Sequence, residues 1–220
     1  MLPGMSRAPT PRTEVRRLPE RGSYDPELIR SILDEALICH VGFVHEGAPV
    51  VIPTIHARLG DTLYLHGSPA SRMLRSMRSG EEICVTVTLV DGLVVARAAF
   101  HNSMNYRSVV VFGSPRIVTD PAEKWDALEA VTEHVVPGRW ADSRPMTKKE
   151  QKGTLVAALP IGEASAKVRT GGPGDDEEDY SLPIWAGVIP LSHTPGAPVA
   201  DERLRAGVET PTYVAEYLRP

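Results

Sequence analysis

The hydrophobic residues of this chain recur with two different spacings, which predict a few short helices around a large sheet. Residues 25–37 have helical spacing, with Asp25 as a cap and Pro26 in the first turn. From residue 38 to 118 the period becomes two, which is typical of strands with one buried face. Turn dipeptides divide this region into predicted antiparallel hairpins: Glu46-Gly47, Gly60-Asp61 and Asp91-Gly92.

Two further helices are predicted beside the sheet. One opens at the cap residue Ser68, has Pro69 in its first turn and stops at Gly80. The other begins at Asp120 with a capping-box pattern and ends before Pro137-Gly138. Residues 154–159 and 163–169 predict two strands that complete the sheet.

The pattern predicts one domain with additions at both ends. Residues 1–22 are rich in Arg and Pro and predict a flexible arm, and residues 23–169 form the main domain. Residues 170–181 are acidic and turn-rich, which favours an exposed loop. Residues 182–220 return to apolar residues and are expected to pack on the main domain.

Composition narrows the partners of the chain. With a formal net charge of -4 and a pI of about 6.0, no general attraction to nucleic acid or anionic lipid is expected. No apolar run approaches the ~20 residues of a membrane span, so a cytoplasmic location is the default. Cys39 and Cys84 lie in apolar strand patterns and are expected to be inert core residues. The seven histidines lack metal-binding companions, so no metal site is expected.

A phosphate site is one interpretation of the helix predicted at Ser68. Its free backbone N–H groups, the hydroxyls of Ser68 and Ser71, and the guanidinium of Arg72 would suit a phosphate. The alternative is a capped helix whose arginines, Arg72, Arg75 and Arg78, are merely exposed.

Pro53 lies within an apolar strand pattern and cannot donate a ladder hydrogen bond. The position is therefore an edge, a bulge or a place where a ligand approaches the backbone. Backbone groups of Pro53, Thr54 and Ile55 could serve a flat ring that carries both donors and acceptors. The alternative is an ordinary edge-strand proline.

Two more groups of polar residues are candidates. Asn105, Tyr106, Arg107 and Ser108 begin a long strand, and alternation sends the first and third to one face and the others to the opposite face. One pair should face a pocket, unless all four are simply solvated. His56 and His66 lie four and five residues from the turn at residues 60–61, as possible cross-strand neighbours. Either would act as a proton donor or substrate contact, or would only satisfy a backbone group.

Three segments together resemble a known family. They are Val51-Ile-Pro-Thr-Ile-His56, Leu65-His-Gly-Ser-Pro-Ala-Ser-Arg72 and residues 97–113, and they resemble the FMN-binding split-barrel family related to pyridoxamine 5'-phosphate oxidase. The resemblance implies a mainly β fold, an antiparallel split β-barrel with short flanking helices. It also implies a homodimer with FMN at the subunit interface. The implied FMN contacts are Pro53, Thr54, Ile55, His66, Ser68, Ser71, Arg72, Asn105, Tyr106, Arg107, Ser108 and Trp185.

The resemblance implies an FMN-dependent oxidoreductase that takes hydride from NAD(P)H or another donor at flavin N5 and acts on a small planar substrate. His56 would be the catalytic residue, with Trp185 also lining the substrate side. Vitamin B6 oxidation is disfavoured, because no Arg-Leu-His-Asp-Arg-like segment lies near the C-terminus. The alternatives are a non-catalytic flavin- or haem-binding protein, with His56, His66 or His193 as haem ligand, and a protein that binds deazaflavin.

Overall fold

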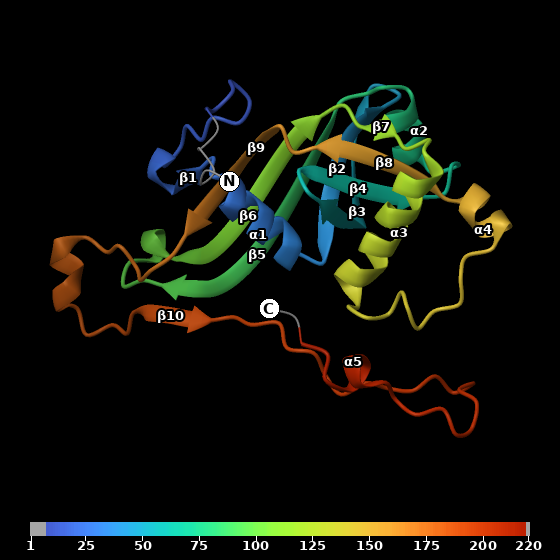
Figure 1. Ribbon diagram of the computed structural model, residues 1–220. Coiled ribbons are helices and arrows are strands. Elements are labelled where there is room, and N and C mark those ends of the chain that lie inside the picture. Colours follow the sequence, from blue (N-terminus) through green and yellow to red (C-terminus); the bar gives the residue numbers. More distant parts are fainter. Residues whose placement is uncertain (1–7, 219–220) are drawn as a thin grey trace.

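A computed structural model describes residues 8–218 as a curved antiparallel sheet with helices against its faces (Figure 1). Within these residues the sheet has ten strands, and its main path runs β1-β9-β6-β5-β2-β3-β4-β8-β7, with β10 added to β5. The strands are β1 (Gly22–Ser23), β2 (Ile38–His45), β3 (Ala48–Leu59), β4 (Thr62–Gly67), β5 (Ile83–Val95), β6 (Ser103–Gly113), β7 (Arg116–Ile117), β8 (Leu155–Pro160), β9 (Glu163–Arg169) and β10 (Gly187–Pro190).

The sheet closes into a barrel because the chain crosses between its two ends. Strands β8 and β9 lie near opposite ends of the strand order, yet only Ile161 and Gly162 separate them along the chain. Strand β3 turns the corner, since residues 48–55 pair with β2 whereas residues 56–59 pair with β4. The antiparallel split barrel predicted from the sequence is confirmed.

Three helices, at residues 26–35, 72–78 and 121–135, pack against the strands of the barrel. Asp25 caps α1 and accepts a hydrogen bond from the Glu27 amide, and Asp120 caps α3 in the same way. Both predicted helices are therefore confirmed, whereas α4, which starts with a Thr147–Glu150 capping box, was not predicted. The helices are α1 (Pro26–Glu35), α2 (Arg72–Arg78), α3 (Pro121–Val135), α4 (Lys148–Gly153) and α5 (Thr212–Ala215), with 3-10 turns at Pro19–Arg21, Ala99–His101 and Glu177–Ser181.

The turn predicted at Asp91-Gly92 is wrong. Strand β5 continues through it, and the register against β6 shifts between Val90 and Gly92, which is a β-bulge. The Asp91 carboxylate binds Arg107 on β6 at 2.7 Å. A dipeptide typical of hairpin turns thus bends one long strand instead, and the chain reverses after Val95.

The helix predicted to open at Ser68 starts later. The Ser68 hydroxyl accepts a hydrogen bond from the Ala70 amide, and the Ser71 amide donates to the Ser68 carbonyl, so these residues form a turn. Helix α2 begins at Arg72 with Ser71 as its cap residue. The side chain of Ser71 makes no capping hydrogen bond.

The N-terminal segment packs on the barrel over the part that the structure describes. Arg12 pairs with Glu82 at 2.9 Å and also with Glu163, and Thr13 is buried. Strand β1 adds to the edge of β9. Residues 8–22 therefore do not form the loose arm that was predicted, while residues 1–7 lie outside the described residues.

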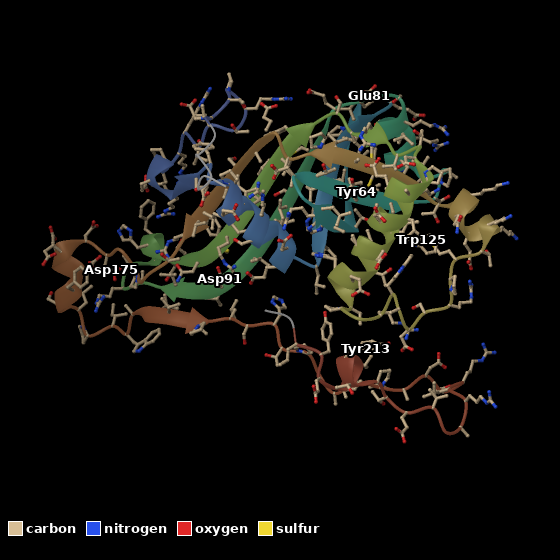
Figure 2. All side chains as sticks on the ribbon, in the orientation of Figure 1. Tyr64, Glu81, Asp91, Trp125, Asp175 and Tyr213 are labelled. Carbon is tan, nitrogen blue, oxygen red and sulfur yellow. The ribbon has the colours of Figure 1, made fainter. Side chains whose placement is uncertain are left out.

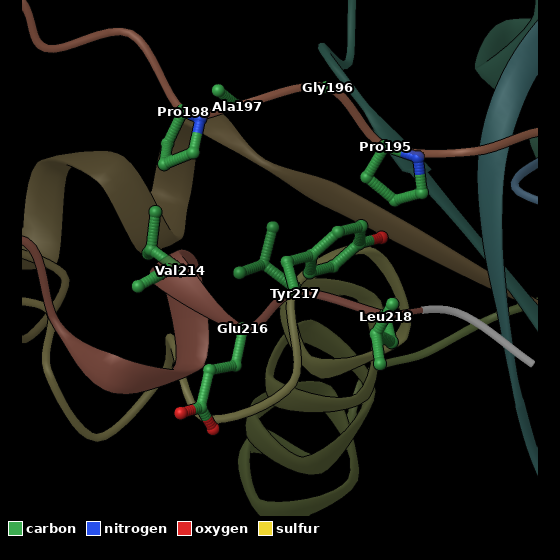
Figure 3. Close-up of a pocket in the computed structure, with 10 residues that line it drawn as sticks. Pro195, Gly196, Ala197, Pro198, Val214, Glu216, Tyr217 and Leu218 are labelled. Carbon is green, nitrogen blue, oxygen red and sulfur yellow. The ribbon is translucent and has the colours of Figure 1, made fainter.

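The C-terminal extension contacts the rest of the chain at its two ends. Strand β10 pairs with β5, and the Tyr217 hydroxyl donates to the Val135 carbonyl at 2.7 Å, at the end of α3. Between them, no hydrogen bond joins residues 192–210 to the barrel in the described structure. A hollow of about 790 Å³ lies between this segment and α3, lined by Pro195, Pro198, Val214 and Tyr217 among others (Figure 3).

The core contains the residues that the alternating pattern predicts. Cys39 is fully buried beside other inward residues of the sheet, and burial raises the pKa of its thiol to about 12. Cys84 is half-buried, and burial also raises its pKa. Both thiols are therefore protonated at neutral pH, as expected for inert core cysteines.

The acidic segment is not entirely solvated. Asp175 lies against the β5–β6 hairpin tip (Figure 2), and its side chain has 0% exposure. Its carboxylate accepts hydrogen bonds from the amides of Arg97 at 2.9 Å and Ala98 at 3.2 Å, and it pairs with the Arg97 guanidinium at 3.1 Å. Burial alone would raise its pKa, but these donors outweigh burial and lower the pKa.

We expect Asp175→Asn to loosen the hairpin tip, because it removes the charge that holds Arg97. The Arg97 and Ala98 amides should exchange with deuterium about tenfold faster than in the unaltered protein. Glu178→Gln, at an exposed position of the same segment, is the matched control and should change nothing.

The same contact predicts a pH dependence. Because the folded-state pKa of Asp175 is lowered, its stabilisation is present above the ordinary carboxyl pKa of roughly 4 and is lost as the pH falls through the lower folded value. Amide protection at the tip should persist at pH 5 and above and disappear in stronger acid. Equal protection of these amides in the Asn variant would contradict this role.

Candidate functional site

The predicted phosphate and ring contacts lie along the chain on either side of the point where β4 separates from β3. The last paired residues are His56 and Leu65, and β4 ends at Gly67. Residues 48–55 of β3 pair only with β2 in the described structure, so their other backbone edge is free. Strand β4 runs on for two residues past its last pair with β3, and the turn 68–71 and the start of α2 follow it.

Pro53 and Ile55 face outward from the barrel, whereas Thr54 faces inward. Pro53 lies opposite His40 and Ile55 opposite Ile38, while Thr54 pairs with the buried Cys39. Because side chains alternate along a strand, Thr54 can offer only its backbone to a ligand on the outer face. Of the three predicted contacts on β3, Pro53 and Ile55 could therefore use their side chains, whereas Thr54 could use only its backbone.

The outer face of β2 and β3 is apolar and uncovered. Ile38 is 48% exposed, Val44 55% and Val51 63%. Val51 pairs with Gly42, which has no side chain, so the sheet surface is flat at that point. A contiguous apolar surface of this kind marks a ligand or protein contact.

His66 is half-buried beside the free edge. Its Nδ1 atom is buried and has no hydrogen-bond partner within residues 8–218. Burial lowers its pKa, so the imidazole is neutral at pH 7. A neutral ring with one unsatisfied buried nitrogen fits a polar atom or a metal of a bound cofactor.

Arg72 is exposed at the start of α2 and forms no ion pair with any described residue. Its guanidinium is therefore available to an anion, as the sequence predicted for a phosphate. Ser71 precedes it, and Ser68 lies in the turn before. Of these side chains only that of Ser68 forms a hydrogen bond, which its hydroxyl accepts from the Ala70 amide.

His56 does not lie on the outer face. It is 0% exposed, and its Nε2 lies 2.9 Å from the Leu33 carbonyl oxygen at the end of α1. Its ring also packs on His134, with centroids 4.9 Å apart. His56 pairs with Leu65 and faces away from His66, so the predicted cross-strand histidine pair is wrong and the position does not suit a catalytic group.

The four residues at the start of β6 divide by face. Arg107 pairs with Glu35 on α1 and Asp91 on β5, contacts that raise its pKa. Asn105 is buried, and its amide nitrogen donates to the Gly171 carbonyl at 3.1 Å. These two are structural within the chain, which leaves Tyr106 and Ser108 as the pair on the outer face.

Trp185 lies far from the free edge within one protomer. It is 66% exposed and precedes Gly187, which pairs with Val95. Pro53 pairs with His40, which pairs with Thr86 on β5, and Thr86 lies nine residues before Val95 on that strand. That separation is about 30 Å along an extended strand. Within the described chain, Trp185 is therefore remote from the outer face at Pro53.

His40 is the outer-face residue that the candidate set missed. It is exposed between Pro53 and Thr86, and its side chain makes no hydrogen bond with a described residue. The signal was present in the alternation, because Cys39 and Val41 on either side are both buried. An imidazole set among apolar side chains is a second possible contact for a cofactor.

Residues 8–218 lack two features that would point to other functions. No helix there is long and apolar enough to cross a membrane. No group of three or more His, Cys, Asp or Glu side chains is placed to hold a metal ion.

Comparisons with known proteins agree with this architecture. Residues 25–168 match the family model described as pyridoxamine 5'-phosphate oxidase. No curated protein matches the chain.

Solved structures give close likenesses. The flavocytochrome Anf3 from Azotobacter vinelandii is 42% identical, with a TM-score of 0.91, over 97% of this chain and 99% of that chain. The FAD and heme binding protein from Mycobacterium smegmatis is 38% identical, with a TM-score of 0.85, over 89% of this chain and 96% of that chain. A protein from Bacteroides thetaiotaomicron, described as a 5-nitroimidazole antibiotic resistance protein, is 26% identical, with a TM-score of 0.57, over 67% and 86%. On the family match and these likenesses, the chain belongs to the pyridoxamine 5'-phosphate oxidase family of split-barrel proteins.

Proposed function

We propose that this protein binds a flavin nucleotide at the point where β4 leaves β3, and that it serves as a redox protein. The observation that carries the proposal is the free backbone edge at residues 53–55, together with the unpaired Arg72 on the helix that follows β4. Two relatives above 30% identity, described as a flavocytochrome and as an FAD and heme binding protein, support a flavin.

The residues present fit the two ends of a flavin nucleotide. The free edge offers backbone donors and acceptors to the polar rim of the ring, and Ile55 offers apolar surface. His66 brings a buried nitrogen that lacks a partner in the described structure. Ser71 and Arg72 would hold a phosphate, as FMN requires. A bound flavin supplies electron and hydride acceptance at its ring, and the protein supplies position and shielding from water.

We expect Arg72→Ala to weaken FMN binding about tenfold and to leave riboflavin binding unchanged, because only FMN carries a phosphate. Quenching of flavin fluorescence during titration measures both affinities. Arg205→Ala, at another exposed arginine, is the control. Undiminished FMN affinity in the Arg72 variant would rule out the phosphate assignment. Failure of the unaltered protein to bind any flavin would rule out the flavin proposal itself.

We also propose that two copies form a dimer through the outer face of β2 and β3. Ile38, Val44 and Val51 leave more apolar surface exposed there than isolated side chains would explain. A second copy on this face would enclose the free edge of β3 and could bring its own Trp185 to the flavin. NAD(P)H and a small planar substrate would enter between the two copies, beside the flavin.

The expected result for Val51→Glu is dissociation of the dimer, because a carboxylate would be buried against the partner without a cation. Sedimentation velocity across a concentration series should show the dimer dissociation constant rising by about 100-fold. Leu59→Glu places the same change at an exposed position near the β3–β4 turn and should leave the dimer intact. A monomeric unaltered protein would contradict the dimer proposal.

A specific observation favours haem as a second ligand. His40 and His66 lie beside the apolar outer face, and each has a ring nitrogen that forms no hydrogen bond with a described residue. Histidine is a common haem ligand. The descriptions of the two relatives support this possibility. His56, earlier a candidate, is committed to the Leu33 carbonyl.

Protein purified with haem supplied during expression should show a Soret band besides the flavin bands. His40→Ala or His66→Ala should alter the Soret band and the electron paramagnetic resonance spectrum of the iron, whereas His56→Gln should not. Anaerobic NADH or NADPH should then bleach the flavin bands if the flavin accepts hydride from a nicotinamide. A Soret band unchanged in both the His40 and His66 variants would exclude these two ligands.

A further inference from the structure

Two histidines meet inside the molecule at the end of helix α1, and the proposed flavin site uses neither. His56 of β3 is 0% exposed, and its Nε2 lies 2.9 Å from the Leu33 carbonyl oxygen. His134 of α3 is half-buried, and its Nε2 lies 2.8 Å from the Ala36 carbonyl oxygen. The two rings pack on one another, with centroids 4.9 Å apart. A strand and a second helix are thus both attached to the end of α1 by imidazoles.

The carbonyl contacts fix where each ring carries its proton. A carbonyl oxygen only accepts hydrogen bonds, so each Nε2 carries the hydrogen when the ring is neutral. Any further proton must bind at Nδ1, and it gives the ring a full positive charge. Because the Nε2–H donor remains, a single charged ring keeps its hydrogen bond to α1.

One positive charge suits this place. Leu33 lies in the last turn of α1 and Ala36 caps that helix, so both carbonyls belong to the negative end of the helix dipole. Asp34 and Glu35 lie in the same turn and add carboxylates to this end of the helix. The pair can therefore hold one proton while the strand and the two helices stay packed.

A second positive charge does not suit it. Two charged rings with centroids 4.9 Å apart repel each other, and His56 is fully buried, so water does not screen its charge. Both rings can be charged only when they move apart and reach solvent. In such an opened form, exposed histidines bind protons with the ordinary pKa of roughly 6.5.

Ionisable residues also flank the pair on α1, α3, β3 and β4. Those with a partner outside the pair are Asp34 with Arg58, Glu35 with Arg107, Glu133 with the amides of Gly138 and Trp140, and Tyr64 with Glu123. His66 follows Leu65, which pairs with His56, so alternation turns the His66 side chain to the opposite face of the sheet. Burial lowers the pKa of His66, which keeps that ring neutral at pH 7.

We propose that His56 and His134 form a proton-sensitive latch, which holds one proton when it is closed and binds a second only when it opens. Opening is favoured as the pH falls below about 6.5, because the opened form binds one proton more than the closed form. Each pH unit below that value would raise the opened fraction by up to about tenfold. His56 directly follows Ile55, the last residue of β3 that pairs with β2. The latch therefore controls the free edge at residues 53–55, whatever ligand binds there.

The test is hydrogen exchange of the full-length protein at pH 7 and pH 5, corrected for the intrinsic pH dependence of exchange. Protection of the backbone amides of residues 55–58 should fall about tenfold or more at pH 5. The amides of residues 97 and 98 at the hairpin tip are the internal reference, because they should stay protected at pH 5. His193→Gln, at an exposed position of the C-terminal extension, is the matched control and should respond as the unaltered protein does.

Glutamine at either position separates the pair from a single buried histidine. His134→Gln and His56→Gln each keep an N–H donor for the α1 carbonyl and remove one titrating ring. Since the remaining histidine can hold one proton with the latch closed, both variants should keep their protection at pH 5. Loss of protection at pH 5 in His134→Gln would overturn the latch, because burial of His56 alone would then explain the response.

Nitrogen-15 spectra of the imidazoles count the protons in the unaltered protein, so this measurement requires no variant to fold. We expect one of the two rings, and not both, to be charged in the closed protein at pH 5. Two charged rings in the closed protein, or equal protection of residues 55–58 at pH 7 and pH 5, overturns the latch. Neither result bears on the proposed flavin site, which Arg72→Ala tests separately.

Discussion

The separation of β4 from β3 is the constraint on which the rest of the architecture depends. Strand β3 pairs with β2 through residues 48–55 and with β4 through residues 56–59, so it belongs to both halves of the barrel. A strand that changes partners leaves one backbone edge unpaired on each side of the change. Unpaired N–H and C=O groups need partners, and a cofactor with a polar rim is one way to provide them. Strand β4 continues past the change only to Gly67, and the turn before α2 follows.

Ion pairs within the chain determine which polar side chains of the barrel remain available to a ligand. Arg107 is held between Glu35 and Asp91 and joins α1, β5 and β6. Such half-exposed pairs contribute little net stability, about 1 kcal/mol or less each, but the planar fork of arginine fixes the geometry of what it joins. The bulge in β5 places Asp91 for this contact. Arg107 therefore positions the barrel and is not a free cation, although its residue type alone suited an anion site.

The fold was predictable to a greater extent than the site. Alternation and capping residues located the strands and the helices at Asp25 and Asp120, because these signals are local. The Asp91-Gly92 dipeptide misled, since its usual role in turns was overridden by a tertiary ion pair with Arg107. The buried Asp175 was missed for a similar reason, because its partners at residues 97 and 98 are far away along the chain. Residue 40 could have been recognised from its buried neighbours.

The histidines show why residue type is a weak guide to chemistry. His56 and His66 are ten residues apart near one turn, yet the first is bonded to a helix carbonyl inside the barrel and the second has a buried nitrogen that the described chain leaves unsatisfied. A single step in strand register separates these outcomes, because it reverses the face of every side chain. The same reasoning applies to charge. Three like charges on one face of α2 repel one another by about 0.2–0.5 kcal/mol per pair. In a chain with net charge -4, carboxylates are in excess. An unneutralised row of arginines is therefore an arrangement that an added anion would stabilise.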